Sequence, residues 1–119
     1  MRLACGDVVD VGAHSETHAL LPALPAEEQW REISGSRTTL ERILGKPVRA
    51  FAFPFGQYSR ETVRLVKEAG FAYACTGQRA AVWRRSQTMA LPRVMVHDCD
   101  GEALERVLRA VVGSCEGRR

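Results

Sequence analysis

One stretch of the chain decides both the expected fold and the candidate site: Val8-Val9-Asp10-Val11-Gly12-Ala13-His14-Ser15-Glu16-Thr17-His18. A β-branched run that ends in glycine and histidine is how a strand delivers a ligand to the carboxyl edge of a parallel sheet, where α/β active sites lie. Neutral imidazole is a common ligand for zinc and its neighbours in the first transition row. The stretch therefore predicts a strand over Val8–Val11, followed by a metal-binding pair, His14 and His18.

The spacing of the two histidines leaves more than one interpretation open. Residues four apart share one face of a helix, but Gly12 and the prolines that follow favour a tight loop or a single turn. The residue after His14 is Ser15, so the H-E-x-x-H helix of metalloproteases is excluded. Taken alone, the segment is equally well explained as two surface histidines in a polar loop.

The rest of the chain alternates between helix-like and strand-like segments, a pattern that predicts an α/β fold with parallel strands. The longest helix is expected over Ala26–Leu44, ended by Gly45 and Pro47, with a weak point at Ser34-Gly35-Ser36. The further strands are expected over Val48–Phe53 and Phe71–Thr76, and Met89–Val96 is expected to be a fourth strand or an extended segment. The further helices are expected from Ser59 to Gly70 and from Asp100 onward, the latter with apolar positions Leu104, Val107, Leu108 and Val111.

Composition narrows the class of protein. The chain has 119 residues, 45% hydrophobic and 26% charged, which is enough for one soluble domain, residues 1–119. The net charge is +3 and the basic residues are scattered along the chain, so nucleic-acid binding has little support. No apolar run is long enough for a membrane span, and no signal peptide precedes the first strand, so the chain as given is expected to be cytoplasmic. The four cysteines have no zinc-finger spacing.

A second motif is Phe53-Pro54-Phe55-Gly56-Gln57-Tyr58. A proline at the end of a strand removes a hydrogen-bond donor, so the chain leaves the sheet there. Its exit can direct the Phe55 N–H into a cleft as an oxyanion donor, and the aromatic rings suit stacking on a sugar. The alternative is a strand-ending turn with aromatic residues in the core.

Four motifs of the chain carry a resemblance to a known family. They are the histidine motif, the Phe53-Pro54-Phe55-Gly56 motif and two later segments, Leu65-Val66-Lys67-Glu68-Ala69-Gly70-Phe71 and Leu91-Pro92-Arg93. The chain resembles the polysaccharide deacetylase family, the NodB-homology domain of carbohydrate esterase family 4. The resemblance runs from about Val8 to Leu108. It implies part of a distorted (β/α) barrel, the C-terminal part of a domain that removes N-acetyl groups from amino-sugar polymers.

The resemblance also implies roles for individual residues. In that family a divalent metal, usually Zn²⁺, is held by an aspartate and by the two histidines matched here by His14 and His18. A second aspartate is the base, and the N–H matched by Phe55 stabilises the oxyanion. His97 is the candidate general acid, with a strand-end structural histidine as the alternative. The expected substrate-binding residues are Phe53, Pro54, Tyr58 and Arg93.

The chain departs from the family pattern at two points. The family's paired aspartates end the first barrel strand, whereas here only Asp7 and Asp10 precede His14, and neither follows a Thr-Phe strand end, so neither takes that role. Ala52 stands where many members carry the arginine that orients the base. Arg93 is a candidate replacement, or it pairs with a surface acid.

These departures predict that the chain lacks the first strands of the barrel and has little or no deacetylase activity by itself. The alternative function is a non-catalytic remnant that binds carbohydrate or protein. An uncovered sheet edge would favour a homodimer, and a lost N-terminus would allow an extracytoplasmic location.

Overall fold

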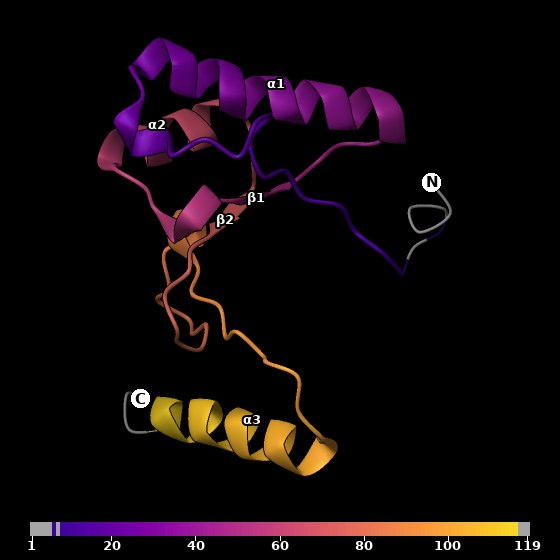
Figure 1. Ribbon diagram of the computed structural model, residues 1–119, viewed down its shortest axis with the longest axis vertical. Coiled ribbons are helices and arrows are strands. Elements are labelled where there is room, and N and C mark those ends of the chain that lie inside the picture. Colours follow the sequence, from indigo (N-terminus) through magenta and orange to yellow (C-terminus); the bar gives the residue numbers. More distant parts are fainter. Residues whose placement is uncertain (1–5, 7, 117–119) are drawn as a thin grey trace.

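The computed structural model of the protein describes residues 6 and 8–116, with side chains through residue 113 (Figure 1). Three helices and two short strands follow one another along the chain. They are α1 (Ala26–Leu44), β1 (Ala50–Ala52), α2 (Arg60–Glu68), β2 (Tyr73–Cys75) and α3 (Gly101–Glu116). Short 3₁₀ turns lie at Leu21–Ala23, Pro54–Gly56 and Thr88–Ala90.

The two strands form a parallel sheet in which Phe51 lies opposite Ala74. Isolated parallel bridges extend it on both sides, because Ala13 pairs with Phe51 and Cys75 pairs with Leu91. Four parallel backbone segments therefore lie side by side in chain order. The predicted α/β fold is confirmed, but over residues 8–116 the sheet stays open and no barrel is formed. A homodimer through the sheet edge stays a prediction.

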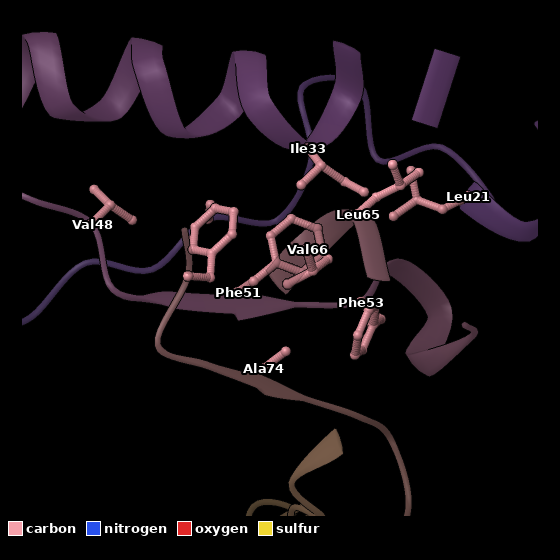
Figure 2. Close-up of a cluster of buried hydrophobic side chains, with 10 residues drawn as sticks. Leu21, Ile33, Val48, Phe51, Phe53, Leu65, Val66 and Ala74 are labelled. Carbon is pink, nitrogen blue, oxygen red and sulfur yellow. The ribbon is translucent and has the colours of Figure 1, made fainter. Parts of the chain in front are cut away.

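The hydrophobic core lies between the sheet and the two helices that cover one of its faces (Figure 2). Phe51 and Ala74 are buried, whereas their neighbours in each strand are only half-buried, because successive side chains of a strand point to opposite faces. Ile33 of α1 and Val66 of α2 are both fully buried against the Phe51 side of the sheet.

Helix α1 has the bounds that the apolar spacing predicts. Gly45 ends it in the left-handed conformation, φ 67°, with its N–H bonded to the Glu41 carbonyl. The helix continues through residues 34–36, so the expected weak point does not split it. Helix α2 begins at the expected cap: Ser59 and Thr62 form a reciprocal capping box.

The strand predicted over Val8–Val11 is wrong. Only Ala13 joins the ladder, and the side chain of Val8 is 97% exposed. In the register set by Ala13 and Phe51, Val9 falls opposite Pro47, which has no N–H to donate. The ladder therefore cannot continue toward the N-terminus.

Of the two alternatives for Met89–Val96, a regular strand is not formed. A 3₁₀ turn ends at Ala90, and Leu91 alone pairs with β2, since Pro92 interrupts the ladder. The helix expected after Asp100 is present as α3, and the Asp100 carboxylate accepts the Ala103 N–H. Figure 1 shows α3 apart from the sheet, and Leu108 on it is half-exposed. None of the helices in the described part of the chain has the length and apolarity of a membrane span.

The turn after β1 brings two stretches of backbone into close approach. Phe55 and Gly56 both have positive φ, 57° and 65°. A Cβ at Gly56 would lie 2.7 Å from the backbone nitrogen of Gly77, which follows β2. Real Cβ contacts are not this short, so the turn needs glycine for its conformation and also for this contact.

Gly56→Ala is therefore expected to destabilise the fold by more than Gly45→Ala. Both glycines are left-handed, which costs a non-glycine residue about 1–2 kcal/mol, but a Cβ at Gly45 meets nothing within 4 Å. Urea unfolding of both variants measures the difference, which isolates the contact with Gly77. Equal losses of unfolding free energy would show that the two backbones do not approach as described.

Candidate active site

His14 stands at the carboxyl edge of the sheet because the preceding residue is part of the ladder. The Ala13 N–H donates to the Ala50 carbonyl at 2.8 Å, and the Ala52 N–H donates to the Ala13 carbonyl at 2.9 Å. The Nδ1 of His14 lies 2.7 Å from the Ala52 carbonyl oxygen. A carbonyl only accepts, so Nδ1 carries a proton, and in the neutral ring Nε2 keeps its lone pair. Metal-binding histidines are commonly oriented by this kind of bond.

His18 and Phe55 complete a cluster of rings. The His14 and His18 ring centroids lie 4.7 Å apart at 70°, and those of His18 and Phe55 lie 4.6 Å apart at 77°. The structure thus brings the two predicted metal ligands together with the predicted oxyanion residue, although 37 positions separate His18 from Phe55 in the numbering. The role of the Phe55 N–H stays a prediction.

Backbone strain is concentrated in the same two segments. Of the described residues, the non-glycine positions with positive φ are Ser15, His18 and Phe55, at 64°, 59° and 57°. Each such conformation costs on the order of 1–3 kcal/mol and persists only where the surroundings hold it in place. Strained residues that cluster in this way are typical of a functional site.

Glu32 of α1 accepts hydrogen bonds from the loop that carries the two histidines, residues 14–18, called the histidine loop below. Its carboxylate accepts the Glu16 N–H at 3.0 Å, the Thr17 N–H at 2.9 Å and the Thr17 hydroxyl at 2.7 Å. Burial raises the pKa of Glu32, but the bonds from the Thr17 amide and hydroxyl and from the Glu16 amide outweigh it. The pKa therefore lies below its ordinary value of 4.5. Sequence reasoning missed this residue, because a glutamate in an amphipathic helix gives no local sign of a distant loop.

Among the described residues, a third metal ligand is not found beside the imidazoles. In the part of the chain that the structure describes, no three histidine, cysteine or acidic side chains are placed to hold a metal ion together. The Asp10 carboxylate accepts the neighbouring Val11 N–H. Asp7 lies outside the described residues.

The predicted substrate-binding aromatics fall into two groups. Phe53 and Pro54 are buried and support the turn from within, whereas Phe55 and Tyr58 are 64% and 41% exposed. The Tyr58 ring lies 5.0 Å from that of Phe53 and lines a pocket of about 310 Å³. Substrate contact by these residues stays a prediction.

Arg93 and His97 lie on the segment that leads from the sheet to α3. The Arg93 guanidinium donates from Nε to the Thr76 carbonyl at 2.8 Å, so it braces the loop after β2 instead of pairing with a surface acid. His97 is exposed and makes no hydrogen bond or ring contact with the described part of the chain. Its catalytic role stays a prediction.

The fold and the site define an α/β protein with paired imidazoles at the carboxyl edge of a parallel sheet. Residues 2–74 match the sequence profile of the polysaccharide deacetylase family, and the chain belongs to that family. No curated protein sequence matches it.

Solved structures agree with the family. The Streptococcus pyogenes deacetylase PplD in complex with acetate is 20% identical, with a TM-score of 0.75 over 81% of this chain and 43% of that one. A polysaccharide deacetylase from Bacillus cereus is 28% identical, with a TM-score of 0.74 over 83% of this chain and 32% of that one. The chain therefore spans less than half the length of either protein.

Glu32→Gln is expected to loosen the histidine loop and to change the pH dependence of stability. The lowered pKa means that Glu32 stabilises the fold fully above its ordinary pKa and loses this effect as pH falls through the folded pKa. At neutral pH the variant is expected to be less stable by about 1 kcal/mol or more, and the gap should close in acid.

Urea unfolding at several pH values measures this, with Glu28→Gln on the same helix as the control because Glu28 is exposed. A stability gap that is equal at every pH would contradict a role for the charged carboxylate.

Proposed function

We propose that the protein is part of a metal-dependent hydrolase that removes N-acetyl groups from amino-sugar polymers. The observation that carries the proposal is the hydrogen bond from His14 Nδ1 to the Ala52 carbonyl, with the His18 ring beside it. This arrangement leaves Nε2 of His14 free as a ligand. Family membership supports the amide of an N-acetyl group as the substrate.

The donor set fits two positions of a zinc site. Imidazole nitrogen suits zinc, and the carbonyl bond fixes the tautomer that a ligand needs. When bound, a divalent cation would polarise the amide carbonyl and lower the pKa of a water molecule. The ligand that completes the site would come from outside the described residues, since they contain no third candidate beside the pair.

The chain's own residues would orient the substrate and stabilise charge. The Phe55 N–H, at a strained turn beside His18, is the candidate oxyanion donor. The exposed rings of Phe55 and Tyr58 offer faces to a sugar. His97 is the candidate proton donor to the leaving amine, which requires the segment before α3 to approach the pair.

A second candidate function has an observation in its favour. Because no base and no third ligand stand beside the imidazoles in the described residues, the polypeptide by itself fits a non-catalytic module that binds carbohydrate. The two functions share a surface and differ only in turnover.

The metal assignment is tested by zinc titration of the whole chain. His14→Ala and His18→Ala are each expected to weaken zinc binding by at least about tenfold, whereas His97→Ala should leave it unchanged. In nitrogen NMR spectra, zinc should shift Nε2 of His14, since Nδ1 carries the proton given to Ala52. Unchanged affinity in His14→Ala would refute the assignment.

Activity is tested by acetate release from chitin oligosaccharides with added zinc. The chain by itself is expected to be slower than an ordinary enzyme by about 10²–10⁴-fold, because the described residues place no base beside the imidazoles. Oligosaccharide binding without acetate release would favour the non-catalytic module. Turnover at ordinary enzyme rates would contradict the expected loss of activity.

A further inference from the structure

The segment from Ala69 to His97, which includes β2 and the loop after it, carries an unbalanced positive charge. From Ala69 to His97 the sequence contains no aspartate or glutamate, but it contains four arginines, more than the whole formal net charge of +3. They are Arg79, Arg84, Arg85 and Arg93. In the part of the chain that the structure describes, the arginine–carboxylate ion pairs all involve arginines outside this stretch. The loop's charges are therefore available to an external anion.

Two of these arginines are presented by a closed turn. The Trp83 N–H donates to the Ser86 hydroxyl at 3.0 Å, and the Ser86 N–H donates to the Trp83 carbonyl at 2.9 Å. Arg84 and Arg85 lie between these bonds and are exposed, and the Trp83 side chain is 43% exposed beside them. Two exposed arginines and an exposed indole on one closed turn suit an anionic ligand that also has a flat face.

The pocket of about 310 Å³ adjoins this turn. Ser86 and Gln87 line it together with Tyr58 and Gln78, and the remaining lining residues are alanine and proline, so it has no charged wall. Neutral amide and hydroxyl groups match the hydroxyl groups of a sugar, and the Tyr58 ring offers a stacking face. Its volume is at the lower end of the range for small-molecule sites.

One short segment, residues 55–58, contributes to both the ring cluster and the pocket. Phe55 contacts His18, and Tyr58, three residues later, lines the pocket while packing on Phe53. The close approach of Gly56 to Gly77 fixes the loop after β2 against the same turn. Figure 1 shows that loop projecting from the sheet on the side away from α1. A polymer seated in the pocket would thus lie next to the imidazoles.

We propose that the pocket and the Trp83–Ser86 turn together bind an anionic amino-sugar polymer. A neutral sugar unit occupies the pocket, and an acidic group on the adjoining unit contacts Arg84 and Arg85. The inference rests on the proposed function and names the charge of its substrate. Basic charge alone would also suit a lipid surface or a nucleic acid, but neither makes use of a sugar-sized polar pocket beside the charge.

The test compares two probes that share N-acetylglucosamine and differ in charge. One is a hexasaccharide in which N-acetylglucosamine alternates with glucuronate, and the other is the neutral chitin hexasaccharide. Calorimetric titration of the whole chain with EDTA present is expected to show tighter binding of the anionic probe by about tenfold, lost at high salt.

Variants divide the site into its parts. The double variant Arg84→Gln/Arg85→Gln is expected to remove the preference for the anionic probe. The matched control, Arg42→Gln/Arg49→Gln, has the same charge change on exposed residues outside the loop and should keep the preference. Tyr58→Ala should weaken both probes. Because Tyr58 packs on Phe53, Gln87→Ala, an exposed pocket residue, repeats that test without a change to the aromatic packing.

Several outcomes would overturn the proposal: no binding, equal affinity for both probes, or an equal loss in the control. Displacement of the anionic probe by a short DNA duplex, or by vesicles with one phosphatidylglycerol per two phosphatidylcholines, would also overturn it. The proposal places probe binding in the pocket and the Trp83–Ser86 turn, so in EDTA this binding does not require a metal at His14. The proposed hydrolysis can therefore fail while this binding holds, and a loss of binding in His14→Ala would move the site to the imidazoles.

Discussion

The hydrogen bond between the His14 ring and the Ala52 carbonyl ties the candidate site to the sheet. Ala52 is the last residue of β1, and its own N–H is bonded to the residue before His14. The register of the backbone thus determines where the imidazole lies and which of its nitrogens is free. A shift of one residue in this pairing would turn Phe51 out of the core and His14 away from the edge.

The site is strained, and the rest of the fold holds it in place. Three non-glycine residues with positive φ would cost on the order of several kcal/mol in isolation. Opposing this cost are the bonds that Glu32 accepts from the loop and the packing of buried Phe51 and Phe53 beneath the turn. Helix α1 therefore serves the site in two ways. Its residue Ile33 packs in the core, and the preceding residue, Glu32, anchors the histidine loop.

Sequence reasoning succeeded where the signal is local. The bounds of α1 and the Ser59 cap of α2 follow from apolar spacing, a glycine and a capping serine, all within a few residues. It failed over Val8–Val11, and it left Met89–Val96 open between a strand and an extended segment, because whether a β-branched run pairs depends on its partner. Pro47 and Pro92 stop the ladder at one end of each segment. Glu32 was missed for a similar reason, because its hydrogen-bond partners lie 15 and 16 positions away in the sequence.

The parallel order of the backbone explains why distant motifs meet. A candidate functional residue follows each of the four parallel segments: His14 follows Ala13, Phe55 follows β1, Gln78 follows β2 and Arg93 follows Leu91. Parallel segments place their carboxyl ends at one edge of the sheet, where ligands bind in α/β proteins. The candidate functional residues therefore gather at one edge of the sheet, and the charge and pocket of the loop after β2 lie on the same edge as the histidines. This shared edge is the physical reason to assign both features to a single substrate.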